Sequence, residues 1–440
     1  MKKSYLLLSA LFCVAYVTSA QTQTAKTPPP VVHPQPGTSA STADGRLTLK
    51  LHTKLQNYDW ADNGPTRDTD IHSPKSVNIH PDGTKLYINS LEGASTVVYD
   101  AATLKKLKTI SHRFNASHSP LWTTPDYYKF NHTYTNPRHF TGKPVESTFS
   151  HGGRYLWIPY YRRSFDINAQ DPSAIAVIDT RTDSIVRLMD AGVLPKMIAT
   201  SPDGRLVAVA HWGDNTVGII DISADNPRLW HHKAMIPIGK QLKWDLSLTE
   251  PVDRDNNSGL ALRGTVFTDD SRYLLVGAMG GGGGIAVIDT ATLRHIGTIY
   301  GMRPNMRHLI FSGGDLYLSI NRDGIVQRIT REQLNKAIAT LAGGKRTVTV
   351  PIDAEARVSP GARTIAASPD GRYIYAACNT ASRLHAIDTS TMKSVLSIEA
   401  DSYPVGLDVS ADGRWIFTTS QGRSRQGGNA VDIYQATLKH

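Results

Sequence analysis

SPDGRLVAVAHWGDNTVGIIDIS, residues 201–223, is the stretch of sequence that decides the fold. An Asp-Gly turn is followed by one short apolar run, then by a second turn, and then by another apolar run. The Asp-Gly pair supplies the positive φ angle that a tight hairpin needs. An Asp after a strand can close an Asx-type turn. The segment therefore predicts short antiparallel strands joined by tight turns.

The same pattern recurs along the chain, which makes it a structural repeat. The turn with its following strand occurs seven times, as HPDGTKLYI (80–88), SHGGRYLWI (150–158), SPDGRLVAV (201–209), TDDSRYLLV (268–276), SGGDLYLSI (312–320), SPDGRYIYA (368–376) and SADGRWIFT (410–418). Four short strands per unit, at a period of roughly 40–45 residues, are typical of propeller blades. Residues 45–440 are therefore predicted to form an all-β fold, a seven-bladed β-propeller of four-stranded antiparallel blades.

The last repeat lacks one strand. After VDIYQAT (431–437) the sequence ends, whereas RLTLKLHTKL (46–55) alternates apolar and polar residues ahead of the first repeat. We expect this N-terminal strand to complete the last blade and close the ring, which leaves few exposed strand edges.

The repeated SPDGRxxY and NTVxxIDT patterns resemble the YVTN-type (YncE-like) seven-bladed β-propeller proteins. The resemblance covers about residues 45–440 and implies the fold. Similar repeats occur in single-stranded-DNA-binding periplasmic proteins, surface-layer proteins, lactonases, and subunits of haem or quinone dehydrogenases. The function must therefore be argued from the site and not from the fold.

The N-terminus has the features of an export signal. Lys2 and Lys3 precede an apolar run, residues 5–17, and small residues end at Ala20. We expect residues 1–20 to be a signal peptide cleaved after Ala20, which implies a periplasmic or extracellular protein. Residues 21–44, rich in Pro, Thr and Ser, are expected to form a flexible tether. The remaining cysteine, Cys378, is expected to be buried, without an internal disulfide.

The composition is that of a globular protein, with 440 residues, 40% hydrophobic, 20% charged and a formal net charge of +10. The sequence contains no GxxxxGK[ST], HExxH, GxSxG, CxxC or CxxCH motif. Gly280–Gly284 precedes a strand and not the helix that a dinucleotide fingerprint requires. We therefore predict no metal site, no cofactor and no transmembrane segment, and we expect a monomer.

Four long segments are expected on one face of the ring, which we call the top face. They are 112–142, 160–174, 241–258 and 420–429. The first is the longest and contains seven aromatic residues and four histidines among bases, with sequons at Asn115 and Asn131. Its aromatics either stack on a ligand or bury themselves in a small core. The opposite face is expected to carry tight turns and one helix, Arg331 to Leu341.

Aligning the innermost strands on their turns produces a column of basic residues. The column contains Lys75, Val145, Lys196, Arg263, Arg307, Arg363 and Val405. Five of its seven members are basic, whereas 48 Lys and Arg in 440 residues predict fewer than one. Glu146 and His308 belong to the next column. Further candidates on the top face are Arg162, Arg163, His211, Trp212, Arg423 and Arg425.

Like charges that converge repel one another unless an anion, an acid or water separates them. The first hypothesis is therefore a non-catalytic propeller that binds an anionic small molecule, a glycan, single-stranded nucleic acid or a protein partner. Alternatively, the bases point outward and are solvated, or pair with loop acids such as Asp253.

Two further hypotheses remain open. A hydrolase or lactonase could use Glu146 or His308 as general base and the arginines to stabilise an oxyanion. A redox subunit with a noncovalent cofactor could use His118, His211 or His308 as axial ligand.

Overall fold

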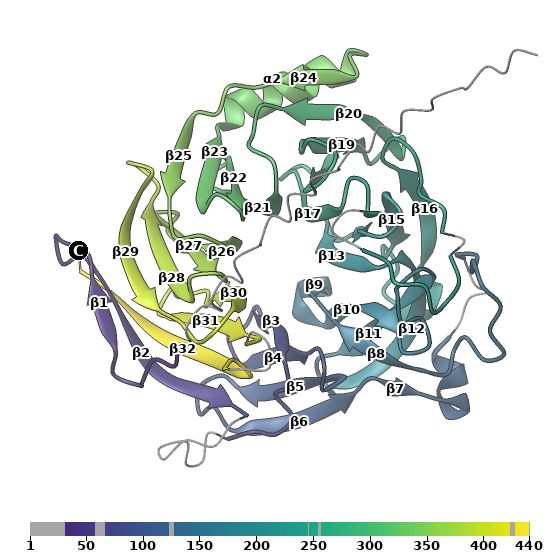
Figure 1. Ribbon diagram of the computed structural model, residues 1–440, viewed down its shortest axis with the longest axis horizontal. Coiled ribbons are helices and arrows are strands. Elements are labelled where there is room, and N and C mark those ends of the chain that lie inside the picture. The colour runs from purple at the N-terminus through teal and green to yellow at the C-terminus, as the bar shows by residue number, and fades with distance from the viewer. Residues whose placement is uncertain are drawn as a thin grey trace, which may run out of the picture. The chain divides into compact units, whose positions relative to one another are not determined.

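The computed structural model describes residues 31–57, 67–122, 127–244, 246–253, 257–422 and 427–439. Seven antiparallel sheets stand in a ring around a central axis (Figure 1). The predicted seven-bladed β-propeller is confirmed.

Each blade has four strands, numbered here from the inner strand outward. Blade one contains β3 (Pro74–Ile79), β4 (Lys85–Ser90), β5 (Ser95–Asp100) and β6 (Lys106–Ser111). Blade two contains β9 (Thr148–Ser150), β10 (Tyr155–Arg163), β11 (Pro172–Asp179) and β12 (Ser184–Val193), with β8 (Phe140–Pro144) and β7 (Arg113–Phe114) added beside β10. Blade three contains β13 (Pro195–Thr200), β14 (Leu206–His211), β15 (Thr216–Asp221) and β16 (His231–Pro237).

Blade four contains β17 (Leu262–Phe267), β18 (Tyr273–Ala278), β19 (Ile285–Asp289) and β20 (Arg294–Tyr300). Blade five contains β21 (Met306–Ser312), β22 (Asp315–Ile320), β23 (Ile325–Ile329) and β25 (Ala354–Arg357). Blade six contains β26 (Ala362–Ala367), β27 (Tyr373–Cys378), β28 (Arg383–Asp388) and β29 (Lys393–Glu399). Blade seven contains β30 (Pro404–Val409), β31 (Trp415–Ser420), β32 (Ala430–Leu438) and β2 (Leu47–Gln56). Short 3-10 helices cover Ala116–Leu121 (η2), His151–Gly153 (η3) and Pro227–Leu229 (η4).

The repeated turn has the geometry that its sequence predicts. In the first repeat, Gly83 adopts a φ of 77°, which glycine reaches at little cost. The Asp82 carboxylate accepts a hydrogen bond of 2.8 Å from the Thr84 backbone N–H. Gly204 and Asp203 repeat this arrangement in blade three. The Asp orders the turn and the Gly allows its backbone, so the second strand starts in register.

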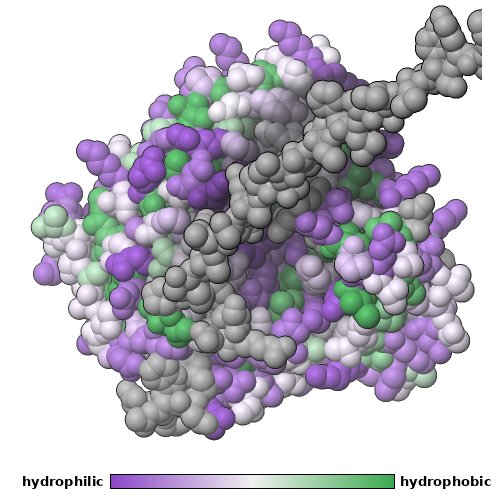
Figure 2. Space-filling model, in the orientation of Figure 1, coloured by the Kyte–Doolittle hydropathy of each residue, from purple (hydrophilic) through white to green (hydrophobic). Residues whose placement is uncertain are grey.

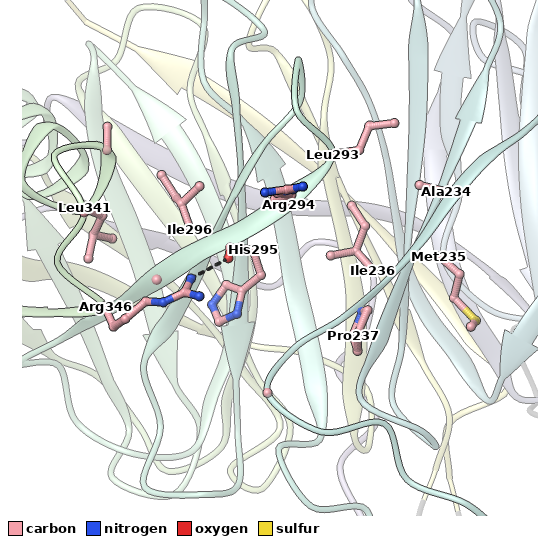
Figure 3. Close-up of a pocket in the computed structure, with 14 residues that line it drawn as sticks. Ala234, Met235, Ile236, Pro237, Leu293, Arg294, His295, Ile296, Leu341 and Arg346 are labelled. Atoms are coloured by element: carbon pink, nitrogen blue, oxygen red, sulfur yellow. Dashed lines mark hydrogen bonds between the residues drawn. The ribbon is translucent and has the colours of Figure 1, made fainter.

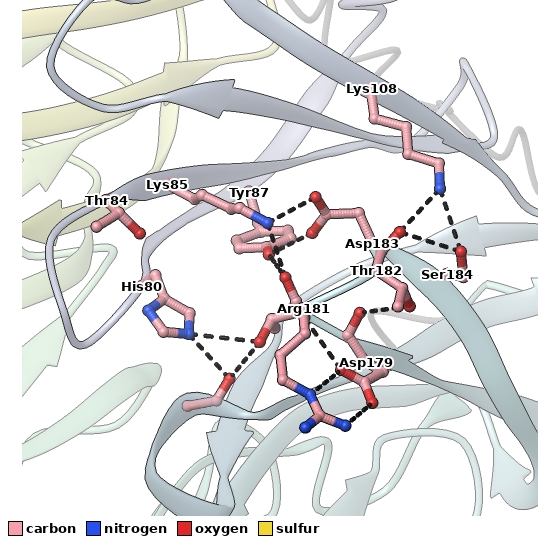
Figure 4. A network of polar contacts seen from close by, with 12 residues as sticks. His80, Thr84, Lys85, Tyr87, Lys108, Asp179, Arg181, Thr182, Asp183 and Ser184 are labelled. Carbon is pink, nitrogen blue, oxygen red and sulfur yellow. Dashed lines mark hydrogen bonds and ion pairs between the residues drawn. The ribbon is translucent and has the colours of Figure 1, made fainter.

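Neighbouring blades pack face to face through their apolar side chains. Between blades three and four, Ala208 and Val217 join Leu274 and Val276 in one cluster, and none of the four is exposed. Polar contacts reinforce the junction of blades one and two, where the Asp183 carboxylate accepts from Lys85 Nζ at 2.7 Å and from the Tyr87 hydroxyl at 2.6 Å (Figure 4). Packing is therefore continuous around the ring.

The N-terminal strand closes the ring as predicted. Strand β2 pairs antiparallel with β32, from Leu47 opposite Leu438 to Gln56 opposite Ala430. The strand β1 (Ser39–Ser41) pairs in turn with β2. Blade seven therefore combines the two ends of the described chain, which ties them together.

The expected tether is wrong for residues 31–44, because this segment is attached to blade seven. The backbone N–H of Val32 donates to Ser402 Oγ at 2.8 Å, and Lys54 Nζ donates to the Pro34 carbonyl. Lys54 also forms a buried ion pair of 2.6 Å with Asp401. Proline and threonine content indicated a solvated chain, yet backbone hydrogen bonds to a strand edge need no apolar side chains. Residues 21–30 and the expected signal peptide lie outside the described residues.

The predicted helix is present as α2 (Arg331–Ala342), between β23 and β25. Thr330 caps its N-terminus and forms a capping box with Gln333. After α2, the strand β24 (Thr347–Thr349) pairs parallel with β20. The segment between β23 and β25 of blade five therefore contributes a fifth strand to the sheet of blade four. No helix among the described residues is long and apolar enough to cross a membrane.

Candidate ligand-binding site

The inner strands place the basic column at equivalent points around the ring. We call the members of this column the ring residues. In every blade except blade two, the ring residue is the second residue of the inner strand, and we call these six strands the regular inner strands. Their ring residues are Lys75, Lys196, Arg263, Arg307, Arg363 and Val405. The inner strands surround the centre of the ring in Figure 1. A rotationally repeated position next to the axis brings side chains from different blades together.

A β-bulge occurs at this position in each of these six strands. In β3 the register shifts between Pro74 and Ser76, so Lys75 is the extra residue. The same shift spans the ring residue in β13, β17, β21, β26 and β30. A bulge interrupts the alternation of side chains and re-aims one of them. The side chains next to the ring residue alternate between the two faces of the blade. The ring residue does not follow this alternation, because it is the extra residue of the bulge.

A left-handed residue precedes each of these bulges by two positions. The six residues are Ser73, Leu194, Ala261, Asn305, Gly361 and Tyr403, with φ from 50° to 93°. Most of them are not glycine, and non-glycine residues adopt this conformation at a cost. The chain therefore enters every regular inner strand through the same constrained bend.

The cations of several blades converge on one indole ring. Lys196 Nζ lies 5.5 Å from the centre of the Trp212 ring, and the guanidinium carbons of Arg263 and Arg307 each lie 5.9 Å from it. Lys196 Nζ also lies 3.9 Å from the centre of the Tyr161 ring. Aromatic faces attract cations, so the rings of Trp212 and Tyr161 partly offset the repulsion between these charges.

Glu146 supplies the negative charge within the cluster. Its Oε1 lies 2.5 Å from Lys75 Nζ and 3.8 Å from an Arg263 nitrogen. These cations hold the pKa of the Glu146 carboxyl below its usual value, although burial acts in the opposite direction. Burial lowers the pKa of Lys75 to about 7, assisted by the charges of Arg363 and Arg263 and opposed by Glu146. Glu146 therefore holds a negative charge at neutral pH.

Two of the other cations, Lys196 and Arg363, have no carboxylate partner among the described residues. Lys196, Arg263 and Arg363 form no side-chain hydrogen bond there, and Arg263 is 2% and Arg363 9% exposed. Burial lowers the pKa of Lys196 well below its usual value, and the neighbouring charges lower it further. The visible part of the central hollow is hydrophilic (Figure 2). The described cluster thus joins five basic side chains and one carboxylate, and Lys75, Arg263 and Arg363 are buried whereas Lys196 and Arg307 are partly exposed.

His308 lies beside the cluster but is directed at the protein backbone. Its Nδ1 is 3.0 Å from the carbonyl oxygen of Ile365, in the neighbouring blade. Burial lowers the pKa of His308 to about 4, which makes the imidazole neutral at pH 7.

Arg162 and Arg163 belong to a different environment from the ring. Arg163 is 1% exposed, and one Nη donates to the Ser173 carbonyl at 2.8 Å and to Asp190 at 3.0 Å. Arg162 donates to the Asp166 carbonyl. Arg163 therefore anchors the chain locally and is not placed to meet a ligand in the channel.

His211 also has a structural setting. Its Nδ1 lies 2.8 Å from Thr216 Oγ1, and its Nε2 accepts from the Gly192 backbone N–H at 3.0 Å. Both ring nitrogens are thus engaged, which leaves no lone pair for an axial iron bond. His118 Nδ1 is likewise engaged in the cap of η2.

The 112–142 insertion forms a small core on blade two. Phe114, Trp122 and Phe140 are 4–8% exposed and pack with Tyr160. The guanidinium of Arg163 lies 5.4 Å from the centre of the Trp122 ring. These aromatics are therefore not a stacking platform for a ligand.

The insertion also packs against two of the other long segments. His132 forms a pair of 2.6 Å with Asp171, and its Nε2 lies 2.8 Å from the Leu246 carbonyl oxygen. Asn168 donates to the Leu248 carbonyl. The segments 112–142, 160–174 and 241–258 thus form one connected surface. Arg423 and Arg425 lie outside the described residues.

Two aromatic residues of the site were missed by the sequence analysis. Tyr161 lies under Lys196, and the guanidinium of Arg363 lies 6.0 Å from the ring centre of Tyr403. Tyr403 could have been found because it stands two positions before the ring residue of β30. Tyr161 had no comparable sequence signal. It reaches the cluster because β10 is longer than the equivalent strands of the other blades, so no repeat position corresponds to it.

A separate cavity of about 890 Å³ lies at the outer edge, between β16 and β20 (Figure 3). Its lining includes Ile236, Ile296 and Leu341, and Arg346 donates to the His295 carbonyl there. It is remote from the inner strands that carry the basic ring. No group of three or more His, Cys, Asp or Glu side chains in the described part of the chain could hold a metal ion.

Comparison with known proteins supports the architecture. No protein-family model and no curated protein matches the chain. Among solved structures, a chain of hydrazine synthase from Kuenenia stuttgartiensis is similar, with a TM-score of 0.57 and 17% identity over 87% of this chain and 100% of that one. The Cps50 (Swd1) β-propeller domain of Myceliophteria thermophila has a TM-score of 0.58 and 13% identity over 83% of this chain and 98% of that one. At these identities the likeness defines the fold class, a seven-bladed β-propeller.

Proposed function

We propose that the protein is an exported, YVTN-type β-propeller that binds an anionic ligand at the mouth of its central channel without catalysing a reaction. One observation carries the proposal. The five cations Lys75, Lys196, Arg263, Arg307 and Arg363 come from five different blades, and only Lys75 and Arg263 are seen to contact a described carboxylate of the cluster, that of Glu146.

The physical argument concerns the cost of this arrangement. Placing like charges together where water is largely excluded is unfavourable. A bulge and a left-handed residue repeat at the ring position, so the backbone orients these side chains in the same way in each blade. An arrangement that costs stability in the free protein is expected where a ligand of opposite charge offsets it.

Two observations favour binding over hydrolysis, and they concern Glu146 and His308, the two candidate general bases. Glu146 is paired with Lys75, and its pKa is lowered and not raised toward neutrality as an efficient general base requires. His308 directs Nδ1 at a backbone carbonyl. An anionic segment of a partner macromolecule could use the same mouth, and the experiment below includes a polymer to separate these cases.

The test is thermal unfolding of the mature protein at low ionic strength, alone and with phosphate, citrate or a single-stranded oligonucleotide. A ligand that binds only the native state raises the melting temperature by mass action, and added salt should reduce the rise by screening. The double variant Arg307→Gln/Arg363→Gln should lose most of the rise.

The matched control is Arg272→Gln/Arg414→Gln, which removes two arginines that form surface ion pairs with Asp289 and Asp412. It should keep the rise of the parent. If no anion shifts the parent, or if both double variants respond equally, the proposed site is wrong.

Export has its own test. The full chain is expressed with its N-terminus intact, and the secreted product is analysed by mass spectrometry. A first residue of Gln21 would support cleavage after Ala20, whereas an intact N-terminus would contradict export by this route.

A further inference from the structure

The charges of the ring are unevenly distributed around the channel. Lys196, Arg263, Arg307 and Arg363 come from blades three, four, five and six, which are consecutive. The remaining cation, Lys75 of blade one, is paired with Glu146 from the segment before β9. Blades two and seven contribute Val145 and Val405 at the ring position, and both are buried. The basic side chains outside this pair thus form an arc and not a full circle.

The arc restricts the kind of anion that fits. Its four cations approach from four strands, and three of them lie within 6 Å of the Trp212 ring centre. Lys196 and Arg363 form no ion pair with a described carboxylate, so a monovalent anion would leave one of these two charges uncompensated. Arg263 and Arg363 are almost fully buried, so a polymer lying across the top face would not reach them with its backbone. A small oxyanion with two or more negative charges meets both conditions.

Lys196 differs from the other members of the arc, because an amine can lose its proton there whereas a guanidinium keeps its charge. Its ammonium faces two aromatic rings, Tyr161 at 3.9 Å and Trp212 at 5.5 Å. The charged groups that lower its pKa most are cations, namely Arg263 of β17, Lys75 of β3, Arg363 of β26 and Arg307 of β21. Glu146 is engaged with Lys75.

We infer that the channel mouth binds a small oxyanion carrying two or more negative charges, and that Lys196 takes up a proton from solvent when this anion enters. The inference rests on the proposed function and adds the ligand class and the linked proton. In the free protein, desolvation and four neighbouring cations favour the neutral amine. An oxyanion among the same groups supplies the missing opposite charge and restores the ammonium.

The direction of the pH effect follows from this linkage. The pKa of Lys196 is lowered well below its usual value in the free protein, and the bound anion raises it again. Affinity is therefore highest below the free-state pKa and falls as the pH rises from there toward the bound-state pKa. Where one full proton is linked, the affinity falls about tenfold per pH unit. The arginines keep their charge and contribute no slope, whereas Lys75, whose pKa is lowered to about 7, adds a contribution of the same sign.

The experiment is isothermal titration calorimetry of the mature protein at pH 7.5 to 9, at low ionic strength, with citrate, sulfate and acetate. Each titration is repeated in two buffers that differ in ionisation enthalpy, so that the difference in heat counts the protons taken up. We expect citrate and sulfate to bind more tightly than acetate, with proton uptake and with an affinity that falls as the pH rises.

The decisive variant is Lys196→Arg, which keeps a positive charge that does not titrate. It should bind citrate with a weaker dependence on pH and buffer than the parent, and the remaining dependence should come from Lys75, whose pKa is also lowered. The matched control is Lys233→Arg, at a half-exposed lysine paired with Asp221 at 3.2 Å, and it should behave like the parent. Circular dichroism confirms that both variants are folded.

The outcomes separate the two proposals. If no anion binds, the proposed function is wrong and the inference falls with it. If citrate binds without a pH slope or buffer effect, anion binding stands and the proton linkage is overturned. Equal affinity for acetate and citrate overturns the requirement for two charges. A slope in Lys196→Arg as steep as that of the parent assigns the proton to another group and overturns the role of Lys196.

Discussion

Glu146 has a specific electrostatic role among the residues of the channel. It comes from blade two, which lacks a basic residue at the ring position, and its carboxylate lies within 3.8 Å of cations from blades one and four. The carboxylate thus contacts side chains from two other blades. A single acid in this position limits the repulsion in the free protein but cannot neutralise the arc.

Replacing Glu146 with Gln should destabilise the free protein by about 3–5 kcal/mol, because removing one partner of a buried pair leaves the other charge uncompensated. Phosphate or citrate should recover part of the loss. Urea unfolding with and without the anion measures both effects.

The control for this prediction is Lys75→Gln/Glu146→Gln, which removes both partners and should lose less stability than Glu146→Gln alone. A Glu146→Gln protein as stable as the parent would show that the carboxylate does not stabilise the ring.

At the scale of elements, the structure makes blade two dependent on the 112–142 insertion. Trp122 is 8% exposed and packs against Phe140, whereas Tyr127 is 43% exposed. Trp122→Ala should therefore cost about 3–5 kcal/mol, as large-to-small changes in a core do. Tyr127→Ala should cost less than about 1 kcal/mol. Chemical unfolding of the two variants compares them directly, and equal small costs would mean that the insertion has no core of its own.

The N-terminal strands offer a second test at this scale. Starting the chain at residue 44 removes β1 and the segment attached to Ser402, while β2 still completes blade seven. Starting it at residue 57 removes β2 as well and exposes the edge of β32. We expect a modest loss of melting temperature from the first deletion, and loss of cooperative unfolding or aggregation from the second. Similar melting curves for both would remove the argument that β2 closes the ring.

At the scale of the whole molecule, the cluster should make stability depend on pH. The pKa of Lys75 is lowered from 10.5 to about 7 by burial, so the unfolded chain binds more protons than the folded one between these values. Stability then rises with pH from about 7 upward, by up to about 1.4 kcal/mol per pH unit for one full proton. Urea unfolding at pH 7, 8 and 9 and low ionic strength measures the slope.

Lys75→Met should reduce this slope, since it removes the group whose folded-state pKa is lowered. A saturating oxyanion should reduce the slope too, because it favours the charged lysines of the folded state. A parent protein whose stability falls between pH 7 and 9 would contradict the burial of a charged amine in the ring.

Part of the site followed from the sequence because the fold is a rotational repeat. Once the Asp-Gly turns fix the register, equivalent positions in different blades occupy equivalent places around the axis. Lys75, Arg263 and Arg363 could therefore be placed together from their spacing alone. The column did not reveal the bulge at these positions, because a bulge has no residue signature that distinguishes it from an ordinary strand start.

Local pattern by itself determined the strands, the turns, the helix after Thr330 and the closing role of β2, since each depends on hydrophobic alternation or on residues a few positions apart. Only the tertiary structure decided which candidates share a site. Arg163 and His211 have the side chains of ligand-binding residues, yet Asp190 and Thr216 engage them in the interior. Tyr161 and Trp212 reach Lys196 because different strands converge on the channel. Burial and charge pairing depend on neighbours that are distant in sequence, and these are set when the ring closes.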